Sequence, residues 1–137
     1  MNISETMTSN VETIDPSKTI RQAGRKMCQR GVGSLPVIAD DKLIGMITDR
    51  DISCFAVAMG RDPNTTEVRK AMSKDVVTCF DDQDISYAAF LMQDRNIRRL
   101  VVINKNEKVV GIISIEDLAR SSNELAGSVL QAYRRAH

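Results

Sequence analysis

The sequence predicts an α+β fold made of two β-α-β-β-α repeats that pack around an internal pseudo-two-fold axis. The first observation is an internal duplication, because residues 4–38 align with 69–103 and residues 42–52 with 108–118, with many identical or similar pairs. The second is the pattern within each copy, where helix-period apolar stripes alternate with short apolar strands. The third is size: a copy of about 60 residues is marginal alone, so two copies should share a core.

Composition limits the classes of partner. The chain has 137 residues, 42% hydrophobic and 27% charged, with a net charge of +1. This is ordinary for globular chains and favours neither nucleic acid nor an anionic membrane as partner. No apolar run approaches the ~20 residues of a spanning helix. Residues 1–8 are polar and do not resemble a secretory signal, so we expect a cytoplasmic location.

The first copy should begin with a short extended piece at 11–14. Pro16 and Ser17 are expected to open a helix, which Gly31 and Gly33 should end. Its apolar stripe at helical spacing consists of Ile20, Ala23, Met27 and Cys28.

A β-hairpin and a second helix should follow. Residues 35–38 and 43–47 read as its strands, with Asp40 and Asp41 in the turn. The second helix should run from Asp49 to about residue 59. Its apolar face comprises Ile52, Phe55, Ala56 and Met59.

The second copy repeats these elements. Residues 76–80 should be extended, and Asp84 or a neighbour should cap a helix. Residues 100–103 and 108–113 should form the hairpin, and Ile115 should begin the closing helix. The helix that begins near Asp84 should carry an apolar stripe, which comprises Ile85, Ala88, Ala89 and Met92.

A linker and a tail complete the chain. The expected boundaries are repeat 1 at 5–60, a linker at 61–71, repeat 2 at 72–122 and a helical tail at 123–137. Thr65 or Thr66 should cap a short helix that runs through Val68 and Met72. The tail carries apolar residues at near-helical spacing, and it should dock on a partner subunit or on its own core. These residues are Leu125, Val129, Leu130 and Tyr133.

The chain offers little for metal or thiol chemistry. Cys28, Cys54 and Cys79 are far apart and form no C-x-x-C pair, so we expect buried or half-buried thiols in a reducing compartment. A redox or metal role is the alternative. The only histidine is His137, which excludes a histidine-based metal site or catalytic triad.

A duplicated motif is the strongest functional signal. Gly45–Asp51 and Gly111–Asp117 each read as a strand that runs into a helix start. Thr48 with Asp51, and Ser114 with Asp117, place a hydroxyl and a carboxylate three residues apart on one helical face. A carboxylate can accept both hydroxyls of a ribose, and a helix start can hold a phosphate. A single [S/T]-x-x-D is usually only a helix cap, and its recurrence in register favours a site.

These motifs resemble those of a tandem pair of CBS (cystathionine β-synthase) domains, a Bateman module. The resemblance rests on VGSLPVI at 32–38, IRRLVVI at 97–103, GMITDRDI at 45–52 and GIISIEDL at 111–118. It covers about residues 5–122. The DPNTT linker is also similar to that of small stand-alone bacterial CBS-pair proteins, including the hypoxic-response type.

The resemblance implies two clefts between the repeats, each able to take an adenosine-type ligand. The first would use Asp117 for the ribose and Ser114 for the phosphate. Its base pocket would be Thr13, Val32 and Gly33. We expect this cleft to be the better site, because its base pocket is lined by small residues.

The second implied cleft would use Asp51 for the ribose and Thr48 for the phosphate. Thr78, Ile97 and Arg98 would surround the base. The sequence departs from the first copy here, because Arg98 stands at the position of a glycine and either clasps a phosphate or fills the pocket. A second departure is a valine at 101 where the first copy has a proline.

The leading functional hypothesis is a non-enzymatic sensor of an adenine nucleotide such as AMP, ADP or ATP. No paired acid and base, activated nucleophile, metal cluster or phosphate-binding glycine loop is visible, so no cofactor is required. NAD and S-adenosylmethionine are alternative ligands. A ligand-free dimerisation or interaction module is the second hypothesis and a thiol redox sensor the third. We expect a homodimer, formed through the helices, and an effector protein of unknown identity.

Overall fold

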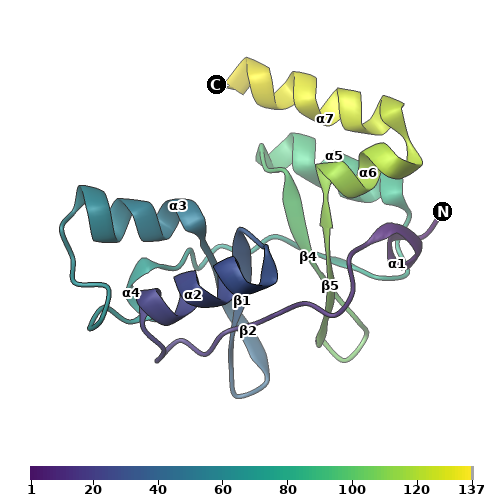
Figure 1. The fold of residues 1–137 in the computed structure, drawn as a ribbon. Coiled ribbons are helices and arrows are strands. Elements are labelled where there is room, and N and C mark those ends of the chain that lie inside the picture. The colour runs from purple at the N-terminus through teal and green to yellow at the C-terminus, as the bar shows by residue number, and fades with distance from the viewer. Residues whose placement is uncertain (137) are drawn as a thin grey trace. The chain divides into compact units, whose positions relative to one another are not determined.

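Both repeats fold into a helix, a β-hairpin and a closing helix (Figure 1). The computed structural model describes residues 1–136, with side chains described for 1–133, so His137 lies outside the described residues. The elements in chain order are α1 (Ile3–Thr6), α2 (Ile20–Arg30), β1 (Ser34–Ala39), β2 (Lys42–Thr48), α3 (Asp49–Ile52), the π-helix η1 (Ser53–Ala58), α4 (Val68–Ala71), β3 (Thr78–Phe80), α5 (Ile85–Arg95), β4 (Arg99–Ile103), β5 (Val109–Ser114), α6 (Ile115–Ser121) and α7 (Asn123–Ala136).

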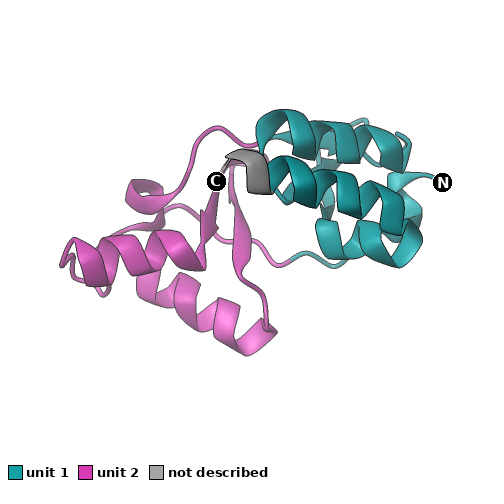
Figure 2. Cartoon of the chain, turned by 90° about the horizontal axis from the view of Figure 1, so that it is seen from above, with its two compact units in different colours: residues 1–11, 77–137 teal, residues 12–76 magenta. Residues whose placement is uncertain are grey.

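The chain divides into two compact units that do not follow the sequence repeats (Figure 2). Unit 1 comprises residues 1–11 together with 77–137, and unit 2 comprises residues 12–76. Helix α1 belongs to unit 1, and helix α4, which lies in the stretch expected to be the linker, belongs to unit 2. The expected repeat boundaries at 5–60 and 72–122 remain a prediction, and the compact units cut across them, because residues 5–11 and 72–76 each pack in the unit that holds most of the other repeat.

Close backbone approach explains the glycine of each duplicated motif. A Cβ on Gly45 would lie 2.6 Å from Met72 Sδ and 2.8 Å from the Ser73 carbonyl oxygen. A Cβ on Gly111 would lie 2.5 Å from Met7 Sδ and 2.9 Å from the Thr8 carbonyl oxygen. Only a residue without a Cβ admits the incoming turn at both positions.

In unit 2, helix α2 begins later than the Pro16 and Ser17 start that the sequence predicts. The Ser17 N–H and hydroxyl both donate to Asp15 Oδ1, at 2.8 and 2.6 Å, which holds this segment in a turn. Thr19 then forms a reciprocal capping box with Gln22. Gly31 ends the helix with a φ of 65°, as predicted.

The second helix of unit 2 widens after one turn of α3 into the π-helix η1, where the Met59 N–H donates to the Cys54 carbonyl at 2.9 Å. A π-turn changes the angular spacing of side chains. Phe55 still packs against the core of unit 2, but Met59 is 55% exposed. The predicted apolar face therefore holds only as far as Ala56.

The two sheets differ because one proline cannot donate a hydrogen bond. Strands β1 and β2 pair antiparallel, as do β4 and β5, in the registers that place both duplicated motifs at strand ends. Strand β3 adds a parallel partner to β4, and the Val101 N–H donates to the Val77 carbonyl at 3.4 Å. Pro36 occupies the equivalent position in β1 and has no N–H, so the expected strand at 11–14 is reduced to a bridge at Ile14.

Unit 1 has the larger described core, and the tail helix completes it. Asp84 caps α5 by accepting from the Ser86 N–H at 3.0 Å, as predicted. Helix α7 contacts α5 and α6 and buries Ala126 and Val129, so the tail packs on its own core. The core residues of unit 1 include Ala88, Met92, Leu100, Val102, Ile113 and Leu118.

The cysteines differ from expectation in two of three cases. Cys79 is buried, and its burial raises the pKa of the thiol to about 12. Cys28 and Cys54 are exposed, because Cys28 lies beyond the edge of the α2 stripe and Cys54 lies in the π-turn. Within the described residues, no helix has the length and apolar character to cross a membrane.

Candidate functional site

The Thr48–Asp51 pair lies where β2 ends and α3 begins, and it forms a half-open carboxylate site. The Thr48 N–H donates to Asp51 Oδ2 at 2.9 Å, and the Asp51 N–H donates to Thr48 Oγ1 at 3.1 Å. This capping box leaves the Thr48 hydroxyl proton free to donate. Asp51 is half-buried, and its Oδ1 accepts no hydrogen bond from the described residues. One carboxylate oxygen and one hydroxyl are thus available to a ligand.

The Ser114–Asp117 pair has the same backbone geometry, but its carboxylate is occupied. Asp117 Oδ2 accepts from the Ser114 N–H at 2.9 Å and from the Ser114 hydroxyl at 3.0 Å. Asp117 Oδ1 pairs with the Arg120 guanidinium and accepts from the Thr8 hydroxyl at 3.4 Å. The residue is 2% exposed. A ribose could reach this carboxylate only after these partners moved.

One substitution between the repeats explains much of this asymmetry. Arg120 aligns with Cys54, which carries no charge and cannot pair with a carboxylate. The Asp51 carboxylate therefore has no cation one turn along its own helix. The sequence favours the Asp117 cleft for its small base pocket, whereas the geometry makes Asp51 the accessible carboxylate.

The residues assigned to the first base pocket lie in two separate hollows of unit 2. Thr13 lines a hollow of about 440 Å³, and its carbonyl accepts from Lys26 Nζ. Val32 and Gly33 line another, of about 360 Å³, beside α2 and α3. A Cβ on Gly33 would approach Asp49 Oδ2 to 3.1 Å. Unit 2 does not bring Thr13 into the same hollow as Val32 and Gly33.

The residues assigned to the second base pocket lie in unit 1 at strand ends. Thr78 begins β3 opposite Val101. Ile97 is half-buried against the core, and its N–H donates to the Met92 carbonyl at 3.0 Å. Side-chain exposure at Thr78 and Ile97 is intermediate, so both retain surface for a ligand.

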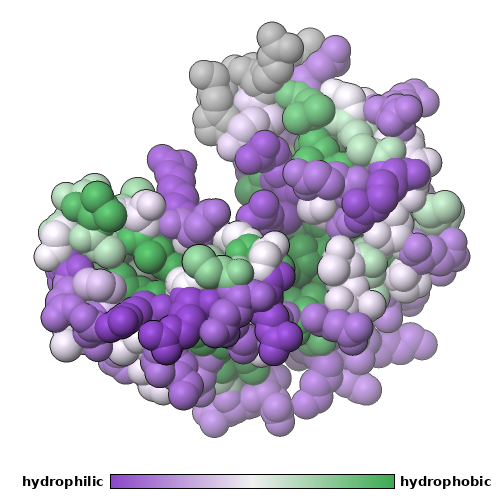
Figure 3. Space-filling view, in the orientation of Figure 1, coloured by the Kyte–Doolittle hydropathy of each residue, from purple (hydrophilic) through white to green (hydrophobic). Residues whose placement is uncertain are grey.

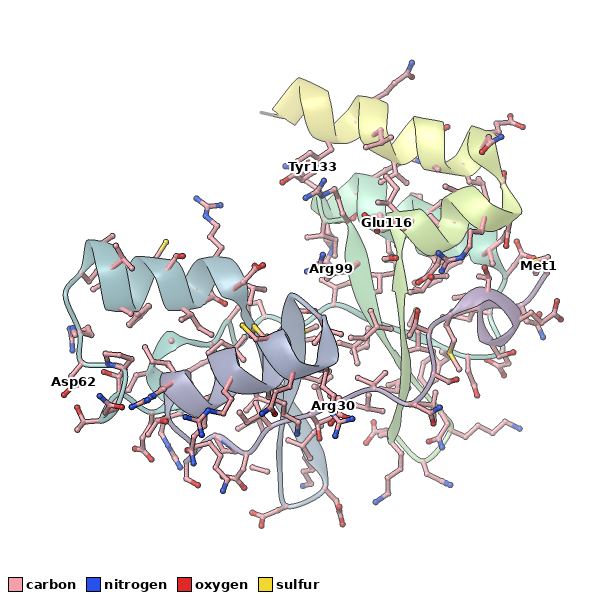
Figure 4. The ribbon with its side chains drawn as sticks, viewed as in Figure 1. Met1, Arg30, Asp62, Arg99, Glu116 and Tyr133 are labelled. Atoms are coloured by element: carbon pink, nitrogen blue, oxygen red, sulfur yellow. The ribbon has the colours of Figure 1, made fainter. Side chains whose placement is uncertain are left out.

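Arg98 of unit 1 contacts an aromatic ring. Its guanidinium carbon sits 5.0 Å from the centroid of the Tyr133 ring, in a cation–π arrangement with the tail helix. Figure 4 shows Tyr133 pointing from α7 toward the ends of the strands. A phosphate that recruited Arg98 would compete with this ring.

Sequence reasoning missed Arg120 and Tyr133 as residues of this region. The Asp117–Arg120 spacing of three residues on a helix is a signal for an ion pair that could have been found. Tyr133 was visible only as part of the tail stripe, because its contact with Arg98 depends on how α7 packs. No group of three or more metal-ligating residues gathers in the part of the chain that the structure describes.

Comparison with known proteins supports one family. The family model described as CBS domain matches residues 3–56 and 67–124. The CBS domain-containing protein YhcV of Bacillus subtilis is 41% identical over 130 residues, which cover 93% of this chain and 91% of that protein.

Two solved structures are similar in fold and hold adenosyl ligands. The CBS domain protein PAE2072 from Pyrobaculum aerophilum, complexed with AMP, has a TM-score of 0.82 at 25% identity and covers 96% of this chain and 99% of its own. The CBS domain pair of protein MJ0100, in complex with 5-methylthioadenosine and S-adenosyl-L-methionine, has a TM-score of 0.78 at 25% identity. The match covers 88% of this chain and 94% of the MJ0100 chain. The duplicated motifs, the two-repeat fold and these matches show that the chain belongs to the CBS domain family.

Proposed function

We propose that this chain is a cytoplasmic regulatory module that binds an adenosine-type ligand, with the ribose on Asp51. The observation that carries the proposal is the open Oδ1 of Asp51 beside the free hydroxyl proton of Thr48. Ionised carboxylates form strong hydrogen bonds to hydroxyl donors. Thr48 is the phosphate-side candidate, and Thr78, Ile97 and Arg98 are the base-side candidates.

The ligand class is supported by AMP in PAE2072 and by two adenosyl compounds in the MJ0100 domain pair. We infer an adenine nucleotide, with AMP, ADP or ATP ahead of NAD and S-adenosylmethionine. The chain's own polar groups at Asp51 and Thr48 recognise the ribose and phosphate of such a nucleotide. The module acts by binding and not by catalysis, and an effector protein reads the bound state.

Calorimetry with a panel of AMP, ADP, ATP, NAD and S-adenosylmethionine tests the proposal. Asp51→Asn should weaken the best ligand about 10- to 100-fold, because a charge-assisted hydrogen bond is worth roughly 1.5–3 kcal/mol. The amide still caps the helix, so the fold should persist. Asp49→Asn is the matched control, since Asp49 lies in the same turn, is exposed and should leave affinity unchanged. Equal losses in both variants, or no heat with any ligand, would refute the assignment.

A ligand-free interaction module is the second candidate. It is favoured by the exposed apolar side chains of unit 2, which include Val57 at 82% and Met59 at 55% exposure. Apolar (green) side chains gather over α3 and its continuation in Figure 3. If the ligand panel gives no heat, this surface becomes the basis for function.

A further inference from the structure

Two exposed aromatic rings mark the outer side of α5 in unit 1. Tyr87 and Phe90 are 40% and 56% exposed, although α7 covers another side of the same helix. Their ring centroids lie 6.2 Å apart at an interplanar angle of 25°, so the two rings form one stacked surface. Neither residue belongs to the core of unit 1. Large aromatic rings outside a core are typical of surfaces at which proteins contact one another.

Acidic side chains accompany these rings. Residues 80–94 contain four aspartates and no lysine or arginine. Asp94 follows Phe90 by four residues, which places it on the same side of α5, one turn along. Within the described residues Asp94 pairs only with the neighbouring Arg95, at 3.5 Å, and both side chains are more than half exposed. Because such a pair contributes little, Asp94 is able to pair with a cation of a partner. Tyr87, Phe90 and Asp94 together form the aromatic face of α5.

The duplication places two arginines at the equivalent side of α2 in unit 2. Arg25 aligns with Phe90, and Arg21 lies one turn earlier. Both are exposed; Arg21 donates to the neutral side chain of Asn64 at 2.7 Å, and the Arg25 side chain has no hydrogen-bond or ion-pair partner among the described residues. The other two cations of α2 already pair with Glu12. Arg21 and Arg25 together form the basic face of α2.

The two faces match in spacing and in chemistry. Arg21 and Arg25 are four residues apart, as are Phe90 and Asp94, and four residues span about 6 Å along a helix axis. If the helices pack antiparallel, Arg25 of one copy lies over the Phe90 ring of the other. Arg21 then lies beside Asp94. A guanidinium over an aromatic ring and a guanidinium beside a carboxylate are both favourable contacts. Two basic faces set against each other would instead oppose arginines, which costs energy.

We propose that the aromatic face of α5 binds the basic face of α2 of a second copy of this chain. Each such contact uses α5 from one copy and α2 from the other. The second copy is the occupant because it carries the complementary pair of charged groups at the matching spacing. None of the side chains of either face belongs to the proposed ligand site, so the inference does not depend on nucleotide binding.

Matched charge reversals test this contact, with the dissociation constant of the dimer measured by sedimentation equilibrium. Phe90→Arg and Arg25→Asp should each raise that constant at least 10-fold, because the first opposes two arginines and the second brings a carboxylate against a ring and Asp94. An equimolar mixture of the two variants should associate within about 3-fold of the unaltered chain, since the introduced arginine then faces the introduced aspartate. Lys70→Asp is the control: Lys70 is exposed on α4, and its substitution makes the same change in charge as Arg25→Asp without affecting association.

Two double variants test the antiparallel register. A chain with Arg21→Asp and Asp94→Arg should associate like the unaltered chain, because the ion pair between copies is only reversed. A chain with Arg25→Asp and Asp94→Arg should stay weak, because the new arginine faces Arg21. Phe90→Leu keeps an apolar side chain but removes the ring, and it should weaken association about 2- to 5-fold. Circular dichroism melts should show an intact fold in every variant, because none of the substituted side chains is buried.

Other results would overturn the inference. If the Arg25→Asp chain associates as tightly as the unaltered chain, α2 is not part of the contact and two α5 faces pair with each other instead. A mixture of the Phe90→Arg and Arg25→Asp chains that stays as weak as its components would exclude the pairing of α5 with α2. A monomeric mass for the unaltered chain at every concentration would exclude the second copy as occupant.

Discussion

At the scale of single residues, the two duplicated motifs share a capping box and differ in what surrounds it. Each carboxylate accepts a hydrogen bond, at 2.9 Å, from the backbone N–H of the hydroxyl residue three positions earlier in the chain. Only Asp117 also receives a guanidinium, and only Ser114 directs its own hydroxyl to that carboxylate. Two identical motifs therefore do not make two identical sites. Arg120 occupies the Asp117 carboxylate, whereas the aligned Cys54 leaves the Asp51 carboxylate able to accept a ligand.

Substitution of Arg120 tests this difference. Arg120→Ala should destabilise the fold by about 1–2 kcal/mol, because the buried Asp117 carboxylate loses a charged partner whose own side chain is largely exposed. It should also raise ligand stoichiometry from one to two per chain by freeing Asp117. Thermal melts and calorimetry measure the two effects.

Arg120→Lys is the matched control for this substitution. It keeps the positive charge and should retain most of the stability and the single-site stoichiometry. An Arg120→Ala variant that matches the unaltered chain in both stability and stoichiometry would show that Arg120 does not hold Asp117 closed.

At the scale of elements, equivalent segments of the two repeats differ where a single residue or turn changes the backbone hydrogen bonding. Pro36 removes a donor and reduces the first strand of repeat 1 to a bridge, while Val101 donates and β3 forms. The π-turn at η1 moves Met59 off the apolar face that a regular helix predicts. The alternation of apolar residues was sufficient to locate the helices and hairpins. Their ends depended on turns and hydrogen bonds that the pattern does not encode.

The glycine within the second strand of each hairpin provides a test at this scale. Gly111→Ala should destabilise the chain by about 1–3 kcal/mol, because its Cβ would meet the Thr8 carbonyl at 2.9 Å as well as Met7. Urea unfolding measures the change in free energy.

Gly127→Ala in α7 is the control, and it should change stability in the opposite direction to Gly111→Ala. Nothing lies within 4 Å of its Cβ, and alanine favours a helix, so this variant should gain about 0.5–1 kcal/mol. If both substitutions shift stability in the same direction, the close approach at Gly111 is not a constraint.

At the scale of the whole molecule, the repeats and the compact units are different divisions of the chain. Each first turn packs in the unit that holds most of the other repeat, through paired hydrogen bonds such as Thr8 with Ile112 at 2.9 and 3.0 Å. Neither unit is therefore made from one continuous repeat. We expect that a chain truncated after residue 61 would lack α4 from unit 2 and expose the surface at Gly45 on which the turn at Met72 and Ser73 packs.

The oligomeric state belongs to this scale as well. We predict a homodimer, because Val57 and Met59 remain exposed in unit 2 and Leu130 remains 45% exposed on α7. Light scattering should give a mass about twice the 15.2 kDa of one chain. Val57→Glu should shift that mass toward the monomer, with Val110→Thr on β5 as a substitution outside this surface. A monomeric mass for the unaltered chain would contradict the prediction.

The sequence by itself determined the duplication, the order of helix, hairpin and closing helix within each repeat, the caps at Thr48, Asp84 and Ser114, and the family. These features depend on local hydrogen bonding and on apolar periodicity, which neighbouring residues along the chain specify. The start of α2, the exposure of Cys28 and Cys54 and the role of the tail were not available from that pattern.

Only the tertiary structure decided which of two matching carboxylates is open and where the tail helix packs. Asp117 is closed by Thr8, which lies 109 positions away in the chain, together with Arg120. Helix α7 packs on α5 and α6 of unit 1, and repeat 1 has no counterpart of this helix. Burial and pairing depend on residues that packing brings together, so a local motif can predict the presence of a carboxylate but not its accessibility.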